Sequence, residues 1–342
     1  MREQQQDLQS VARMLVAGSK GILAADESGG TIGKRFERVH VESTEQTRRA
    51  YRDLLLTAPG IEQYISGVIL FDETIHQSAH DGTPFPQLLL KKGILPGIKV
   101  DKGAVDLPGF PGEKVTEGLD GLRGRLAEYR RLGAKFAKWR AVIAIGANFP
   151  TRTGLEANAY ALAQYAALCQ EAGLVPIVEP EVLMDGDHTL ERCEAVTEQA
   201  LRLVFFRLEE HRVQLDGMLL KPNMVVPGKQ SARQAGVLQV AQATIRCLRR
   251  TVPAAVPGIV FLSGGQSPEL ASEHLNAMQA LGPHPWAVGF SYARALQEPA
   301  LQAWKGNPAN VGEAQRLFIE RARLNSLARE GRYSEEMEKK AA

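Results

Sequence analysis

The chain has 342 residues, of which 44% are hydrophobic and 23% charged, values typical of a folded globular protein with a large core. Its formal net charge of +2 and the lack of long blocks of like charge argue against nucleic acid or an anionic membrane as the main partner. No apolar run is long enough to span a membrane, and the N-terminus MREQQQDLQS has no secretory core, so we expect a cytoplasmic protein.

In chain order, short apolar runs alternate with amphipathic stretches of helical length, beginning with a helix over residues 4–17 and ending with one over 311–330. The runs predict eight strands: GILAAD ending at Asp26, YISGVILF at Phe71, LPGIKV at Val100, FAKWRAV at Val142, LVPIVEPE at Glu181, GMLLKP at Pro222, GIVFLSGG at Gly265 and WAVGFSY at Tyr292. Such alternation is typical of a parallel sheet, and eight units favour a (β/α)8 TIM barrel over an open doubly wound sheet.

The domain organisation follows from the absence of a Pro-, Gly- or Ser-rich linker or a low-complexity tract. We expect one α/β domain over residues 1–342, with a helical extension at 1–19 and a C-terminal helix and short tail at 306–342. The three cysteines are widely spaced and odd in number, which favours buried or half-buried thiols over a disulfide framework or a zinc cluster.

Ionisable and hydroxyl side chains recur at the C-terminal ends of the predicted strands, where barrel enzymes build their active sites. They are Asp26, Ser28, Lys99, Lys138, Arg140, Glu179, Glu181, Lys221, Ser263 and Arg294. Residues two apart, such as Glu179 and Glu181, point to the same face of a strand. A structural ion-pair network is the alternative, but buried charges at the same end of six strands favour a functional site, because each costs several kcal/mol.

Lys221 ends an apolar run and directly precedes a proline. A lysine in water is almost entirely protonated at pH 7 and is therefore a poor nucleophile. Apolar neighbours such as Met218 and Pro222, with the cations Lys138 and Lys99 on nearby strand ends, favour the neutral amine. This combination predicts a lysine that attacks a ketone and holds it as a Schiff base, with Glu179, Glu181 and Asp26 moving protons.

Two turns are candidate phosphate sites. FLSGGQSPE puts Ser263, Gly264 and Gly265 between the seventh strand and a helix, and Arg294 follows the eighth strand in SYAR, the region where barrels bind phosphate. DESGGTIGKR fails both the Walker and the dinucleotide glycine patterns. It predicts either a hydroxyl-rich, basic turn holding a second phosphate through Ser28, Thr31, Lys34 and Arg35, with Lys99 and Arg140, or a solvated loop.

A metal site has little support in the sequence. His76 and His80 have the i, i+4 spacing of a helical metal pair, but no glutamate flanks either residue and the other histidines are dispersed. We therefore predict no metal ligands and no cofactor, since an iminium on Lys221 would itself be the electron sink.

The chain resembles the class I, Schiff-base fructose-1,6-bisphosphate aldolases over residues 8–334. The stretches that carry the resemblance are LAADES, GIKVDKG, GLDGL, FAKWR, PIVEPE, LLKPNM, FLSGGQS, SYARALQ and AWKGN. The resemblance implies a metal-independent (β/α)8 barrel enzyme of glycolysis that acts on a phosphorylated sugar and is commonly a homotetramer. Alternatives are a Schiff-base aldolase for fructose 1-phosphate or sedoheptulose 1,7-bisphosphate, and a non-catalytic phosphosugar-binding scaffold.

The resemblance also implies roles for single residues. Lys221 matches the Schiff-base lysine, Glu179 the acid/base of carbinolamine dehydration, and Asp26 the residue that deprotonates the C4 hydroxyl. Lys138 and Glu181 match supporting groups. The remaining matches are phosphate contacts, with Ser263, Gly264, Gly265, Ala293 and Arg294 at the C1 end, and Ser28, Thr31, Lys99, Arg140 and Arg35 at the other end or nearby.

Two positions depart from the family pattern. Ala293 stands where many members have glycine, which keeps the N–H but adds a Cβ beside the phosphate. The sequence ends in SEEMEKKAA rather than in the terminal tyrosine of the familiar eukaryotic members, and Tyr333 matches an earlier tyrosine. The resemblance therefore assigns no residue to protonate the enamine.

Overall fold

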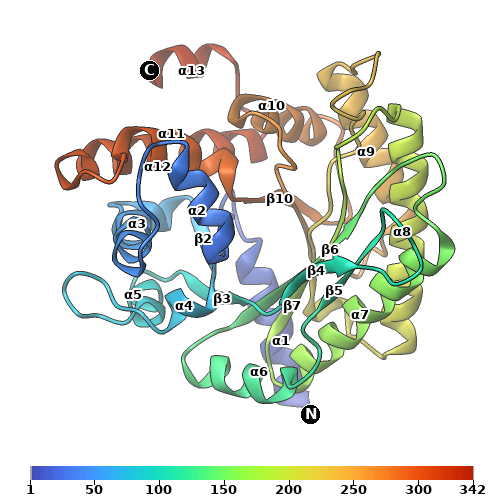
Figure 1. Cartoon of the computed structure of the whole chain (residues 1–342), viewed down its shortest axis with the longest axis horizontal. Coiled ribbons are helices and arrows are strands. Elements are labelled where there is room, and N and C mark those ends of the chain that lie inside the picture. The colour runs from blue at the N-terminus through green and yellow to red at the C-terminus, as the bar shows by residue number, and fades with distance from the viewer. Residues whose placement is uncertain (1, 342) are drawn as a thin grey trace.

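Eight parallel strands close into a barrel in the computed structural model, which describes residues 2–341 (Figure 1). Around the barrel the order is β1-β10-β9-β8-β7-β6-β3-β2, and β1 pairs with both β10 and β2. The strands are β1 (Gly21–Ala25), β2 (Ile65–Leu70), β3 (Leu95–Lys99), β6 (Phe136–Ile143), β7 (Val175–Val182), β8 (Leu219–Leu220), β9 (Gly258–Phe261) and β10 (Ala287–Tyr292). The β1–β10 pairing confirms the predicted TIM barrel and excludes an open doubly wound sheet.

Helices surround the barrel and connect its strands (Figure 1). They are α2 (Gly29–Glu37), α3 (Glu45–Thr57), α4 (Asp72–Ile75), α5 (Phe85–Lys91), α6 (Leu122–Arg131), α7 (Arg152–Glu171), α8 (Leu190–Glu210), α9 (Val237–Thr251), α10 (Pro268–Gln279), α11 (Arg294–Trp304), α12 (Val311–Arg329) and α13 (Glu336–Ala341), with short 3-10 turns η1 (Ile61–Gln63), η2 (Leu215–Gly217) and η3 (Pro308–Asn310). The predicted last helix corresponds to α12.

The first helix, α1 (Arg2–Leu15), closes the end of the barrel where the strands begin. Its buried residues Leu8 and Leu15 form one apolar cluster with strand residues such as Phe136 and Val175, the first residues of β6 and β7. A Cβ on Gly67 would lie 2.6 Å from the Leu15 side chain, so only glycine lets α1 approach β2 this closely. The barrel interior is therefore closed by α1 at the end where the strands begin.

Three elements differ from the sequence prediction. The antiparallel hairpin of β4 (Gly103–Asp106) and β5 (Lys114–Glu117) was not predicted, because its strands are short and mostly exposed. The predicted turn after Asp26 is largely the helix α2, whose buried Ile32 and Phe36 have helical i, i+4 spacing despite the glycines at its start. The predicted C-terminal tail contains α13. The single domain over 1–342 stays a prediction, and residues 1 and 342 lie outside the described residues.

The remaining sequence features lie as follows. Cys169, Cys193 and Cys247 are free and buried, as expected of structural thiols. Among the helices of residues 2–341, none combines the length and apolar character that a membrane crossing requires. Tyr333 follows α12, is buried, and donates a hydrogen bond to Glu338.

Candidate active site

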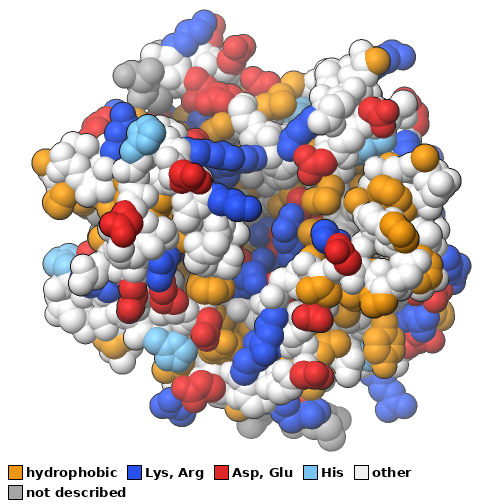
Figure 2. Space-filling view, viewed as in Figure 1, with side chains coloured by type: hydrophobic (Ala, Val, Ile, Leu, Met, Phe, Trp, Pro, Cys, Tyr) orange, Lys and Arg blue, Asp and Glu red, His pale blue; other side chains and the backbone are white. Residues whose placement is uncertain are grey.

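A pocket of about 380 Å³ opens at the C-terminal ends of the barrel strands. Figure 2 shows a hollow in this face with lysine and arginine side chains gathered along it. Lys34, a candidate phosphate contact, is exposed on the surface and is not among the residues that line the pocket. The other fifteen site residues predicted from the sequence line it: Asp26, Ser28, Thr31, Arg35, Lys99, Lys138, Arg140, Glu179, Glu181, Lys221, Ser263, Gly264, Gly265, Ala293 and Arg294. Residues up to 268 positions apart in the sequence are thus brought together by the closure of the barrel.

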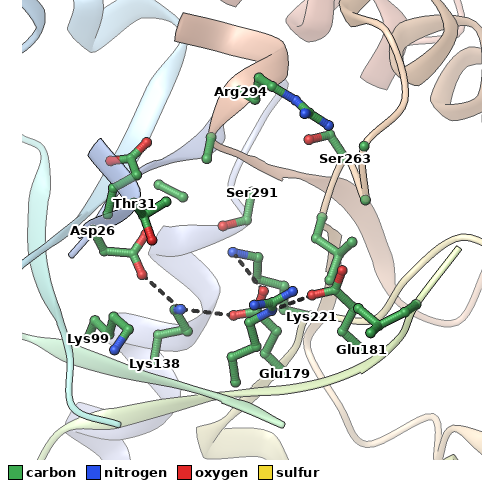
Figure 3. Close-up of a pocket in the computed structure, with 18 of the residues that line it drawn as sticks. Asp26, Thr31, Lys99, Lys138, Glu179, Glu181, Lys221, Ser263, Ser291 and Arg294 are labelled. Carbon is green, nitrogen blue, oxygen red and sulfur yellow. Dashed lines mark hydrogen bonds and ion pairs between the residues drawn. The ribbon is translucent and has the colours of Figure 1, made fainter. Parts of the chain in front are cut away.

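Two lysines and two carboxylates alternate along the floor of the pocket (Figure 3). The Nζ of Lys221 lies 3.3 Å from Oε1 of Glu179, whose Oε2 lies 3.2 Å from the Nζ of Lys138. The same Lys138 Nζ lies 2.7 Å from Oδ2 of Asp26. Glu179 therefore contacts both lysines, and Lys138 contacts both carboxylates.

These four charged groups are almost entirely withdrawn from water. The side chains of Lys221 and Glu179 are each 4% exposed, that of Lys138 is 5% exposed and that of Asp26 is 10% exposed. A buried charge costs several kcal/mol unless it is paired, and the alternating order gives each ion an opposite neighbour. The four groups are therefore buried but electrostatically balanced.

The electrostatic consequences are clearest at Asp26 and Lys138. Burial alone would raise the pKa of Asp26, but the positive charges of Lys138, Lys221 and Lys99 outweigh it and lower the pKa to about 2. Burial alone would lower the pKa of Lys138, but the negative charges of Asp26, Glu179 and Asp101 raise it above its usual value. At neutral pH Asp26 is therefore a carboxylate and Lys138 an ammonium.

The strand registers explain why these side chains meet. Lys138 on β6 is aligned with Lys99 on β3, and Arg140 is aligned with Glu179 on β7. Alternation along β6 and β7 turns residues two apart into the barrel mouth. Lys221 directly follows the two-residue β8, and its backbone N–H donates to the carbonyl of Val178 at 2.8 Å. That bond extends the β7–β8 pairing and fixes the base of the Lys221 side chain.

The loop of Ser263, Gly264 and Gly265 follows β9 and leads into α10. Both glycines have positive φ, +58° and +93°, a backbone region that residues with a Cβ rarely adopt. The buried Gln266 side chain donates to the Ser263 carbonyl at 3.0 Å and so holds the turn. Arg294 is the first residue of α11 and lies beside Ser263 (Figure 3). The backbone N–H groups of this loop and the Arg294 guanidinium therefore lie near the N-termini of α10 and α11. The helix dipoles there favour the binding of an anion.

The basic residues at the other end of the pocket are paired with carboxylates. Lys99 Nζ lies 2.6 Å from Oδ1 of Asp101, and Arg140 forms an ion pair with Glu181. Lys99 lies on the far side of Lys138 from Lys221 in Figure 3, so its charge is directed at Asp101 rather than at the Lys221 amine. The expectation that Lys99 crowds Lys221 is therefore not supported by the geometry.

The helix α2 carries the remaining predicted phosphate contacts. Ser28 stands at its N-cap, and the hydroxyl oxygens of Ser28 and Thr31 lie 3.2 Å apart. Arg35, one turn later, forms an ion pair with Glu27. The sequence predicted a hydroxyl-rich basic turn here, and the structure corrects this to the first turns of a helix whose N-terminus lies at the pocket.

Seven further lining residues escaped the sequence analysis, and Glu27, Asp185 and Ser291 are the polar or charged ones among them. Ser291 on β10 points into the pocket, and its buried Oγ has no hydrogen-bond partner within residues 2–341 (Figure 3). The feature of the sequence that could have indicated Ser291 is its position near the C-terminal end of the predicted strand WAVGFSY. Glu27 is buried and pairs with Arg35 and Arg52, so it holds Arg35 at the pocket edge. The feature of the sequence that could have indicated Glu27 is its position as a second carboxylate directly after Asp26.

The two histidines with metal-like spacing do not share a helix. α4 ends at Ile75, His76 caps it, and His80 lies in the following loop, where its Nδ1 is 3.0 Å from Oδ2 of Asp53. Across the described part of the chain, no group of three or more His, Cys, Asp or Glu side chains is arranged to hold a metal ion.

Comparison with known proteins gives a consistent result. The profile of the family described as "Glycolytic: Fructose-bisphosphate aldolase class-I" matches residues 7–342. A protein of Xanthomonas campestris pv. campestris named "Probable fructose-bisphosphate aldolase class 1" is 57% identical over 329 residues, covering 96% of this chain and 98% of that protein. Arabidopsis thaliana "Fructose-bisphosphate aldolase 6, cytosolic" is 55% identical over 315 residues, covering 92% and 88%.

A solved structure is similarly close. Fructose-bisphosphate aldolase from Plasmodium falciparum, solved in complex with TRAP and a small-molecule inhibitor, superposes with a TM-score of 0.96 at 49% sequence identity, covering 98% of this chain and 97% of that one. The fold and the family profile agree along nearly the whole length. The chain belongs to the class I fructose-bisphosphate aldolase family.

Proposed function

We propose that the chain catalyses the reversible cleavage of fructose 1,6-bisphosphate to dihydroxyacetone phosphate and glyceraldehyde 3-phosphate through a Schiff base on Lys221. The observation that carries the proposal is the buried row Lys221, Glu179, Lys138 and Asp26 at the mouth of the barrel. It combines an amine nucleophile with carboxylates on either side of a fixed positive charge. Membership of the family and the names of the relatives support this activity.

In the first stage, Glu179, whose Oε1 lies 3.3 Å from the Lys221 Nζ, takes a proton from the Lys221 ammonium, and the resulting amine attacks the C2 carbonyl of the open-chain ketose. A second proton passes from the nitrogen to the C2 oxygen to form the carbinolamine hydroxyl, and Glu179 returns the first proton to this hydroxyl as it departs. Water leaves and a protonated imine forms. The Lys138 ammonium stays 3.2 Å from the other Glu179 oxygen, Oε2, during these transfers.

In the second stage, the C3–C4 bond breaks. Asp26 accepts the proton of the C4 hydroxyl, the oxygen forms the aldehyde carbonyl, and the bonding electron pair moves to C3 and into the iminium as an enamine. Asp26 is ionised at neutral pH because its pKa is about 2, so it is free to accept the proton. Protonation of C3 and hydrolysis then release dihydroxyacetone phosphate and regenerate Lys221. No metal or other cofactor enters these steps.

The two phosphates are assigned to the two ends of the pocket. The C1 phosphate binds the loop of Ser263, Gly264 and Gly265, the N–H of Ala293 and the guanidinium of Arg294. The other phosphate lies toward Ser28, Thr31, Lys99 and Arg140, with Arg35 as a further contact. The unpartnered Ser291 hydroxyl, buried between the two ends, would hydrogen-bond a hydroxyl of the sugar.

Glu181 supports the first stage indirectly. It lies two residues from Glu179 on β7 and binds Arg140. Because Arg140 neutralises Glu181, two ionised carboxylates can face the same pocket without strong mutual repulsion. We also propose a cytoplasmic location, in line with the relatives named cytosolic, and a homotetramer of single-domain subunits, as is common in the family.

The decisive experiment is borohydride reduction in the presence of dihydroxyacetone phosphate, followed by peptide mapping. We expect the label on Lys221, and an activity that is indifferent to a chelator. Lys221→Arg should keep the fold and abolish turnover, because a guanidinium does not lose its proton. A label on another residue, loss of activity with chelator, or substantial cleavage by Lys221→Arg would refute the proposal.

A further inference from the structure

Two loops are joined at the rim of the pocket, one after β7 and the other after β8. The backbone N–H of Lys229 donates to the Met184 carbonyl at 2.8 Å, and that of Gly228 donates to the His188 carbonyl at 2.8 Å. A Cβ on Gly228 would lie 2.2 Å from the carbonyl oxygen of Gly186, so the two backbones are in direct contact. These contacts fix the backbone of Lys229 at the pocket rim.

The Lys229 side chain reaches the glycine loop that we assign to the C1 phosphate. Its Nζ lies 3.4 Å from the point where a Cβ on Gly265 would stand, and NH2 of Arg294 lies 3.1 Å from the same point. Two cationic nitrogens on different elements therefore flank Gly265. Oxygens of one phosphate group can accept hydrogen bonds from both.

Lys229 is paired with a carboxylate, whereas Arg294 has no carboxylate partner among residues 2–341. Lys229 Nζ lies 2.9 Å from Oδ1 of Asp185, and both side chains are about half exposed, at 45% and 66%. Within residues 2–341 no carboxylate lies within ion-pair distance of Arg294, and burial together with the positive charges of Arg35 and Arg38 lowers its pKa. An exposed pair such as Lys229–Asp185 contributes little stability and exchanges easily.

We propose that Lys229 is a specificity-determining residue that leaves Asp185 to bind the phosphate held by the glycine loop and Arg294. In the proposal, Asp185 is the counterion that phosphate replaces. The proposal rests on the proposed function, because it needs a phosphorylated substrate at this end of the pocket. Lys229 would be the second cation at that phosphate site, beside Arg294. It is not among the site residues predicted from the sequence.

A purely structural role for the pair makes a different prediction. If the Lys229–Asp185 ion pair only joined the two loops, removing either charge would loosen the same contact and weaken phosphate binding in the same direction. If Lys229 binds phosphate, removing its own charge weakens binding, whereas removing Asp185 frees it and strengthens binding. The signs of the two effects separate these roles.

Direct repulsion of phosphate by Asp185 would also make Asp185→Asn bind more tightly, and the double variant distinguishes this case. Repulsion alone gives the same gain with or without Lys229. Release of Lys229 gives a gain only when Lys229 is present, so the two substitutions are not additive.

The test measures the inhibition constant of inorganic phosphate, the KM for fructose 1,6-bisphosphate and the concentration of dihydroxyacetone phosphate that half-saturates borohydride trapping. We expect Lys229→Met to raise all three by about five- to tenfold, the size of one charge-assisted hydrogen bond in a partly exposed site, with a smaller effect on kcat. Lys229→Arg should retain most of the affinity. Asp185→Asn should lower the three values by about two- to threefold, because Asp185 then no longer competes with phosphate for Lys229. It should change none of the three values in the Lys229→Met background.

Lys20→Met is the matched control, because Lys20 directly precedes β1 at the opposite end of the barrel and its loss changes the net charge equally. Equal values for Lys229→Met and the wild type, or weaker binding by Asp185→Asn, would overturn the inference. An equal gain from Asp185→Asn in both backgrounds would also overturn it. If wild-type Lys221 is not labelled, the proposed function fails instead, so the two failures are distinguishable.

Discussion

Lys138 Nζ lies 2.7 Å from the Asp26 carboxylate in a pair that is almost completely buried. The pair raises the pKa of the lysine and lowers that of the aspartate, so both remain charged at neutral pH. It also connects the two stages of the proposed reaction, because the same Lys138 contacts Glu179. In the proposed reaction, Schiff-base formation at Glu179 and bond cleavage at Asp26 therefore take place on either side of one fixed cation.

Asp26→Asn should separate these two stages. The amide keeps the size of the side chain but cannot take the C4 hydroxyl proton, so we expect kcat for fructose 1,6-bisphosphate cleavage to fall about 10²- to 10⁴-fold. Dihydroxyacetone phosphate has no C4, and its trapping on Lys221 by borohydride should persist. Asp81→Asn, in an exposed loop, is the control. Cleavage within tenfold of the wild-type rate would contradict the role of Asp26.

Glu27→Gln should destabilise the protein. Glu27 accepts a hydrogen bond from Arg52 at 2.7 Å and also pairs with Arg35, and the charges of these arginines outweigh burial and lower its pKa. The Arg52 side chain is 3% exposed, so loss of the carboxylate charge leaves a buried guanidinium without a counterion. We expect the free energy of unfolding in urea to fall by about 3–5 kcal/mol.

The control for Glu27→Gln is Glu37→Gln, an exposed residue on α2. It removes the same charge from the same region without touching a buried arginine, and should change the free energy of unfolding by less than about 0.5 kcal/mol. Similar effects of the two substitutions would show that the Glu27 ion pairs are not the source of the stability.

The positions of the candidate site residues could be predicted because the barrel imposes them. An apolar run that ends in a charged residue indicates the C-terminal end of a buried strand. Closure of the sheet brings these strand ends together at one opening of the barrel. Period-two alternation then places Glu179 and Glu181 on the same face, as observed on β7. For Lys221 the apolar run itself predicted the burial that the structure has.

The partners of the long side chains could not be predicted in this way. Lys99 and Arg140 line the pocket as expected, but one pairs with Asp101 and the other with Glu181. The carboxylate that each of these side chains pairs with depends on its rotamer and on the position of carboxylates from other segments. Strand periodicity encodes neither of these. Lys229 was missed for a related reason, because it reaches Gly265 from a loop whose path depends on contacts with the loop after β7.

Gly265→Ala should impair substrate binding more than stability. The residue has φ of +93°, and its added Cβ would lie 3.1 Å from NH2 of Arg294 and 3.3 Å from Sδ of Met184. The left-handed conformation costs an alanine about 1–2 kcal/mol, and displacement of Arg294 removes a phosphate contact. We expect KM for fructose 1,6-bisphosphate to rise at least about tenfold.

Gly312→Ala, in α12, is the matched substitution, because its Cβ would meet nothing within 4 Å. It should leave KM unchanged and stabilise the fold slightly, since alanine is the better helix former. A Gly265→Ala protein with wild-type KM would show that the glycine loop does not hold the phosphate.

His274 should make stability depend on pH between about 4 and 6.5. The residue is buried on α10, its Nδ1 lies 2.5 Å from Oε1 of Gln266, and burial lowers its pKa to about 4. Between these pH values the unfolded chain binds a proton that the folded protein does not, so stability is complete above pH 6.5 and is lost as the pH falls toward 4. The loss amounts to about 3 kcal/mol.

Urea unfolding of the wild type and of His274→Asn between pH 4.5 and 7.5 tests this dependence. The variant is expected to be less stable at pH 7, because it disturbs the Gln266 contact that holds Ser263, yet its stability should fall less steeply as the solution is acidified. His76→Asn, at an exposed position, should keep the wild-type slope. Parallel pH curves for the wild type and His274→Asn would mean that another group is the source of the acid sensitivity.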